Sequence, residues 1–161
     1  MHYDYTRDAL YHPERKSAFV GFGEGLAFDA TEPGYSAINA WWLSNAAHLA
    51  YYDPTSLRMA LNGVGLELVA FFDQGATQGY LAKTPDYGIL SFRGTQPDEF
   101  QDTLQDLRIK LTPFEQGGTV HAGFLEALEP VWVSVESALK GLGHLPVWYT
   151  GHSLGAALAV L

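Results

Sequence analysis

The feature that most constrains the fold of this chain is the pentapeptide Gly151-His152-Ser153-Leu154-Gly155, a Gly-x-Ser-x-Gly pattern between two apolar runs. The residues VWYT before it indicate a buried strand, and the residues AALAVL after it indicate a buried helix. A serine hydroxyl projects from a sheet edge toward a base only if the strand-to-helix turn is tight and strained, and glycines leave room for that turn. The pattern therefore predicts a nucleophilic Ser153. The alternative interpretation is a glycine-rich turn with an incidental serine.

The predicted helix after Ser153 has a consequence for charge stabilisation. Its unpaired backbone N–H groups and the positive end of its dipole would face an oxyanion that forms beside the serine. The N–H of Leu154 is the natural first donor, and a second donor must come from another loop. We expect Gly151, His152 and Gly155 to support this arrangement.

Hydrophobic periodicity predicts helices and strands before this motif. Thr31 and Pro33 give start signals for a helix that is buried on one side, and a shorter helix is expected over residues 56–61. The runs LELVAFF, GYLAKT and ILSF, separated by turn residues, predict strands joined by hairpins. The buried stripe of the first helix is expected to hold Ile38, Trp41, Trp42, Asn45 and Leu49.

The second half of the chain predicts two more helices. Apolar spacing indicates an amphipathic helix over residues 99–111 and a long helix from Leu125, which Pro130 would kink or restart. Strands followed by helix, strand and helix favour an α/β layer architecture. No repeat or linker divides the chain, so we expect one domain over residues 1–161, with a loosely structured N-terminal segment over residues 1–30.

Composition limits the partners. The chain has 18 Asp and Glu residues against 9 Lys and Arg residues, a formal net charge of −9, which would repel nucleic acid and anionic membranes and suits a neutral or apolar substrate. There is no cysteine, and no spacing of His, Asp or Glu indicates a metal site, so neither metal nor cofactor is expected. No apolar run is long enough to span a bilayer and no signal peptide is evident, so we expect a soluble protein, cytoplasmic or exported by another route.

Three ordered segments carry a resemblance to a known family. The sequences SFRGT at residues 91–95, VHAGF at residues 120–124 and GHSLG at residues 151–155 resemble, in order and spacing, segments of the class 3 (fungal-type) lipases. The resemblance runs from about Tyr35 to the end of the chain. It implies the N-terminal part of an α/β-hydrolase fold, with the central sheet up to the nucleophile strand and the start of the following helix.

The resemblance also implies a reaction and further site residues. A triacylglycerol lipase or carboxylesterase would cleave an ester through an acyl-enzyme on Ser153, with the backbone N–H of Thr95 as the second oxyanion donor. The element DTLQDL at residues 102–107 resembles one in which the second aspartate, here Asp106, braces the oxyanion loop. Thr103 replaces a tryptophan often found there. The stretch from Gln96 to Lys110, which contains this element, would form a lid, although its apolar face is modest and equally suits packing on the core.

The partners of the serine are not assigned in this sequence. In α/β-hydrolases an acid and then a histidine follow the nucleophile, and this sequence ends at Leu161. We therefore expect the N-terminal part of a larger enzyme, inactive alone, whose remainder lies on a second chain, was lost by proteolysis or was deliberately removed. His121 is expected to bond to backbone, and use of His121 or His144 as a substitute base is an alternative. An acyltransferase with the same nucleophile, or a non-catalytic module, are the other hypotheses.

Overall fold

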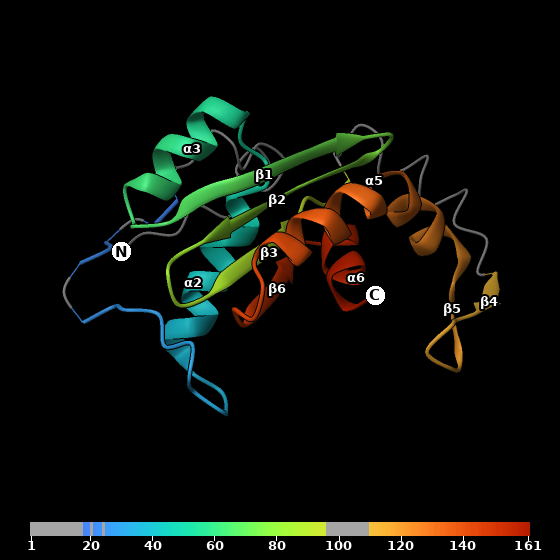
Figure 1. The fold of residues 1–161 in the computed structure, drawn as a ribbon, viewed down its shortest axis with the longest axis horizontal. Helices are drawn as coiled ribbons and strands as arrows, with labels where there is room; N and C mark the ends of the chain where they lie inside the picture. Colours follow the sequence, from blue (N-terminus) through green and yellow to red (C-terminus); the bar gives the residue numbers. More distant parts are fainter. Residues whose placement is uncertain (1–17, 20, 24, 96–109) are drawn as a thin grey trace, which may run out of the picture.

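The computed structural model describes residues 18, 19, 21–23, 25–95 and 110–161. A mixed sheet lies between two layers of helices (Figure 1). In chain order the elements are α2 (Ala37–Leu49), α3 (Pro54–Asn62), β1 (Glu67–Gln74), β2 (Thr77–Lys83), β3 (Gly88–Phe92), β4 (Leu111–Pro113), β5 (Thr119–His121), α5 (Ala122–Gly141), β6 (Val147–Gly151) and α6 (Leu154–Val160). None of these helices is long and apolar enough to cross a membrane.

The sheet combines antiparallel hairpins with one parallel pair. Its strand order is β1-β2-β3-β6; β1, β2 and β3 pair antiparallel, and β6 pairs parallel to β3. The parallel pair is connected through α5, as expected for a crossover between parallel strands. Phe92 is paired with Gly151, so the carboxyl ends of β3 and β6 meet at one edge. Within the described chain, β6 is an outer strand of this sheet.

Two separate apolar cores cover the two faces of the sheet. α2 and α3 pack on one face, which we call the α2 face, while α5 and α6 pack on the other, the α5 face (Figure 1). Along β2 and β3 the side chains alternate between the cores, as strand geometry requires. The pairing of β1 shifts between Leu68 and Ala70, and this bulge sends Leu68 into the α2-face core and Phe72 into the α5-face core.

Three side-chain hydroxyls from the sheet bind backbone carbonyls of α2. The Tyr80 hydroxyl and the Ser91 hydroxyl both donate to the carbonyl of Ala46, at 2.8 and 3.2 Å. The Thr150 hydroxyl donates to the carbonyl of Leu43 at 3.0 Å. The last four carbonyls of a helix lack partners within it, so the Ala46 carbonyl is available for such bonds. The helix is thereby fixed in both position and register on β2, β3 and β6.

The predicted elements are largely confirmed, with two corrections in the first half. The first helix begins after Ser36, whose hydroxyl accepts from the Asn39 N–H, and not at the signals of Thr31 and Pro33. Ile38, expected on the buried stripe, is 36% exposed, whereas Asn39 is buried because its amide bonds to the backbone of Asp29. The α/β fold class, the short second helix and the strand run are confirmed.

The second half holds two further differences. Of the helix predicted over residues 99–111, positions 99–109 lie outside the described residues, and Leu111 begins β4, which pairs with β5 in a hairpin that the sequence did not predict. The long helix begins at Ala122, because His121 caps it, and it continues through Pro130 without a break.

Candidate functional site

Ser153 occupies a strained turn between β6 and α6. Its backbone has φ 54° and ψ −121°, and among the described residues Phe19 is the other non-glycine residue with a positive φ. Residues with side chains adopt this region at a cost of order 1–3 kcal/mol, which the surrounding structure must offset. The turn is closed by hydrogen bonds from the Gly155 N–H to the His152 carbonyl at 2.9 Å and from the Ala156 N–H to the Ser153 carbonyl at 3.0 Å. Ser153 is exposed to solvent at this turn.

Gly151 and Gly155 allow this turn because no side chain fits at either position. A Cβ on Gly151 would overlap the backbone of Gly155, and one on Gly155 would overlap the carbonyl of Phe92. α6 therefore packs directly on the backbone of β3. Close backbone packing of this kind is what turns the chain sharply from β6 into α6.

The segment after β3 lies against the same turn. A Cβ placed on Gly94 would be 2.6 Å from the His152 carbonyl and 3.1 Å from the Ser153 Cβ. This proximity follows from the parallel pairing, since Phe92 and Gly151 are partners and both chains leave the sheet at its carboxyl edge. The two segments touch at Gly94 and Ser153. Thr95, which is half-buried, directly follows Gly94, and Leu154, the first residue of α6, directly follows Ser153.

The structure adds a residue that sequence reasoning missed. The Tyr51 hydroxyl lies 2.8 Å from Nδ1 of His152, although the two residues are 101 positions apart. Burial raises the pKa of Tyr51, while the hydrogen bond from the Gly94 backbone and the positive charge of Arg93 act in the opposite direction. No local pattern around Tyr51 signals this contact, because it depends on where the end of α2 lies relative to β6.

Arg93 approaches the site from the end of β3. Its Nε atom is buried and has no hydrogen-bond partner among the described residues. The expected bracing residue Asp106 lies outside the described residues.

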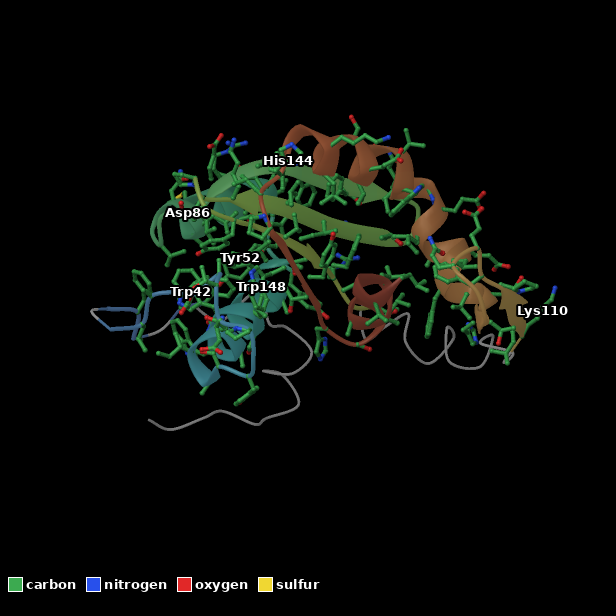
Figure 2. The ribbon with its side chains drawn as sticks, turned by 60° about the horizontal axis from the view of Figure 1, so that its bottom comes forward. Trp42, Tyr52, Asp86, Lys110, His144 and Trp148 are labelled. Carbon is green, nitrogen blue, oxygen red and sulfur yellow. The ribbon has the colours of Figure 1, made fainter. Side chains whose placement is uncertain are left out.

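The other candidate bases lie away from Ser153 or are otherwise engaged. His121 caps α5, with its Nδ1 accepting from the Gly123 N–H at 3.2 Å, and its ring contacts Phe124. His144 precedes β6, whereas Ser153 follows it, so the length of a five-residue strand, roughly 16 Å, separates them. Figure 2 shows His144 beside the sheet, well to the left of Lys110, which lies at the right-hand end of the view. Among the described residues, no hydrogen bond joins either histidine to Ser153.

An apolar groove lies beside the outer strand but apart from Ser153. Its volume is about 270 Å³, and it is bounded by α5, α6, β3 and β6. Trp132, Tyr149 and Val160 line it and are exposed at 44%, 50% and 87%. None of residues 93–95 or 151–155 lines this groove.

Known proteins resemble the chain in part of its sequence and in its fold. Residues 89–161 match the family model for lipase (class 3). A Rhizomucor miehei lipase–propeptide complex superposes with a TM-score of 0.59 at 19% identity, over 75% of this chain and 42% of that chain. MDLA from Penicillium cyclopium has a TM-score of 0.58 at 21% identity, over 73% and 52%. A lipase from Rhizopus microsporus var. chinensis has a TM-score of 0.50 at 25% identity, over 67% and 40%.

These similarities differ in what they establish. No curated protein sequence matches the chain. The structural neighbours establish the fold, and the chain spans about half of their length or less. The family model covers the segments that contain Thr95, His121 and Ser153. Residues 89–161 are therefore similar to the class 3 lipases, and the chain has the fold of the N-terminal part of an α/β-hydrolase.

Proposed function

We propose that the protein is a serine hydrolase that cleaves carboxylic esters of lipids through an acyl-enzyme on Ser153. The single observation that carries this proposal is the strained, exposed Ser153 turn packed against Gly94. Holding α6 to the sheet does not require a serine with a positive φ, because a glycine would adopt this backbone conformation without strain. A strained serine supported by tight backbone packing is what nucleophilic attack requires.

The proposed reaction uses the Ser153 hydroxyl and two backbone donors. The Ser153 oxygen attacks the ester carbonyl carbon while its proton passes to a histidine base, and the carbonyl oxygen becomes an oxyanion. The N–H groups of Leu154 and Thr95 are the proposed donors to this oxyanion, which preorganised N–H groups stabilise. The alkoxide leaves as the alcohol after taking the proton from the histidine. A water molecule then hydrolyses the acyl-enzyme by the same route and regenerates Ser153.

The remaining groups of the triad are part of the proposal. The acid and the histidine base are expected in that order after Ser153, and none of residues 1–161 is assigned to either role. The formal net charge of −9 favours a neutral ester over an anionic one, since long-range repulsion lowers the association rate of a like-charged substrate. Lipid esters fit both this charge and the family of residues 89–161.

The direct test is covalent labelling of the serine. Intact-mass spectrometry first measures the length of the purified natural protein, and the protein is then treated with a fluorophosphonate probe. We expect one adduct, located on Ser153 by peptide mapping. The Ser153→Ala variant should give none, while Ser44→Ala, which removes an exposed serine of α2, should label like the natural protein.

Two outcomes separate this function from its rivals. The proposal is contradicted if the purified protein has an acid and a histidine after Ser153 and still gives no adduct. Such a protein is a non-catalytic module. Product analysis of a short p-nitrophenyl ester, with and without added alcohol, separates hydrolysis from acyl transfer. Release of free acid that Ser153→Ala abolishes supports the hydrolase.

A further inference from the structure

The Tyr51 hydroxyl lies at a junction of three segments. It contacts Nδ1 of His152 at 2.8 Å, and it accepts a hydrogen bond from the Gly94 backbone. The residue itself follows α2, where its N–H donates to the His48 carbonyl at 3.2 Å. One side-chain oxygen thus connects the end of α2, the segment after β3 and the turn that carries Ser153.

The direction of these bonds follows from the donors available. The Gly94 N–H can only donate, so it takes one lone pair of the Tyr51 oxygen and leaves the hydroxyl proton free. A half-buried hydroxyl without an acceptor loses stability, and the neighbouring acceptor is Nδ1 of His152. The Tyr51 hydroxyl therefore donates to Nδ1, which holds the neutral His152 ring in the tautomer protonated at Nε2.

The junction has no room for movement. A Cβ on Gly94 would lie 2.7 Å from the Tyr51 hydroxyl and 2.6 Å from the His152 carbonyl, so this glycine is the residue that lets the three segments meet. The end of α2 is itself fixed, because the hydroxyls of Tyr80 and Ser91 bind the carbonyl of Ala46. The position of the Tyr51 oxygen is therefore set by the sheet.

We propose that Tyr51 is a positioning residue, whose hydroxyl holds the Gly94 segment and the His152–Ser153 turn at the spacing that two oxyanion donors require. This inference rests on the proposed function for its consequence in catalysis. The donors, the N–H groups of Thr95 and Leu154, each follow directly on a segment that the hydroxyl binds. Tyr51 acts through these segments and not on the substrate.

The first experiment measures the junction without any catalytic activity. In the natural protein, the ¹⁵N shifts of the His152 ring should report the tautomer protonated at Nε2, and the Gly94 amide should exchange slowly with solvent. Tyr51→Phe should give a mixed tautomer population and at least about tenfold faster exchange at Gly94, since loss of one hydrogen bond of about 1.4 kcal/mol changes the opening equilibrium tenfold. A single unchanged tautomer and unchanged exchange in Tyr51→Phe would overturn the inference.

The matched control is the neighbouring tyrosine. The Tyr52 hydroxyl also accepts from a backbone N–H, that of Ala18, but it does so away from the Ser153 turn. Tyr52→Phe removes the same group and should leave the His152 shifts and the Gly94 exchange unchanged. If Tyr52→Phe alters them as Tyr51→Phe does, the effect is general loosening and the positioning role is wrong.

The second experiment measures the consequence for the reaction. With a soluble ester, Tyr51→Phe should lower kcat about tenfold and leave KM within about twofold, because misplaced donors weaken transition-state binding more than substrate binding. Combining Tyr51→Phe with His152→Ala should give less than the sum of the two single effects, since both changes break the same bond. Additive effects, or a loss confined to KM, would contradict the proposal.

The two experiments also separate this inference from the function on which it rests. A natural protein that shows the fixed tautomer but never labels at Ser153 refutes the proposed function and, with it, the role of Tyr51 in positioning donors. A natural protein that labels normally, together with a Tyr51→Phe variant that labels at the same rate, refutes the positioning role alone.

Discussion

The two faces of the sheet are covered in different ways. On the α2 face the carbonyls of α2 accept hydrogen bonds from the hydroxyls of Tyr80, Ser91 and Thr150, and large side chains such as Trp42 are almost completely buried. On the α5 face the Thr77 hydroxyl donates to the Ala127 carbonyl of α5, and the apolar core opens into a groove of about 270 Å³ beside β6. The better anchored face is the one that carries Tyr51 to the Ser153 turn. The proposed role of Tyr51 would make the α2 face the one that positions the Ser153 turn.

The largest expected effect tests whether burial really differs between the faces. Trp42 is 3% exposed and its indole N–H donates to the Leu26 carbonyl, so Trp42→Ala should lower the free energy of unfolding by about 3–5 kcal/mol. Trp132, 44% exposed at the groove, should cost about 1 kcal/mol when changed to alanine. Urea unfolding of both variants measures the contrast, and equal losses would show that the groove side is as well packed as the α2 face.

A smaller effect tests the hydroxyl anchors. Ser91→Ala removes one of the two hydrogen bonds to the Ala46 carbonyl and should cost about 1 kcal/mol, because Tyr80 still satisfies that carbonyl. Ser134 is an exposed serine on α5, and Ser134→Ala should change the stability by less than about 0.5 kcal/mol. If Ser91→Ala is as neutral as Ser134→Ala in urea unfolding, the anchors do not distinguish the faces.

The smallest effect is a pH dependence confined to the α2 face. Hydrogen bonds from the Ser56 hydroxyl and the Ser56 backbone N–H lower the pKa of Asp53, the capping residue of α3, below its ordinary value of 3.8. A lowered folded-state pKa gives stability that is present above about pH 4 and is lost as the pH falls through the folded pKa. Asparagine also caps helices but does not titrate, so Asp53→Asn keeps the cap and removes its pH dependence.

The measurement for this pH dependence compares the natural protein with Asp53→Asn in urea from pH 7 to pH 2. We expect the natural protein to be more stable at neutral pH and the difference to disappear at the acid end. A constant difference across this range would mean that Asp53 titrates normally and that its cap is energetically like that of asparagine.

Much of the fold could be predicted from the sequence, because strand and helix periods are local. The apolar run at residues 89–92, bounded by turn residues, and the apolar spacing in α5 predicted elements of the correct type. The bulge in β1 could not be found, since LELVAFF is apolar on both sides and hides the point where the strand changes face. The β4–β5 hairpin was missed because its strands are three residues long, below the length at which a period can be recognised.

The site also contains residues that the sequence predicts and residues that it does not. Ser153, Leu154 and the two flanking glycines form one continuous segment, so local chemistry was enough to predict their arrangement. Thr95 was reached through the resemblance of residues 91–95, and its role as a donor stays a prediction. Tyr51 could not be found, because its contact with His152 depends on the register of α2 on three strands. Long-range register is set by tertiary packing and leaves no periodic signal.

The bulge in β1 has a consequence for how this domain could change by mutation or design. Because Leu68 and Phe72 lie on one strand but in different cores, substitutions at these positions do not share neighbours, and their energetic effects should add. One core can therefore be redesigned for a new partner while the other keeps its composition. The strand β1 thus separates two cores that can be changed independently. Only one of these cores contains α2, the helix that ends near Ser153.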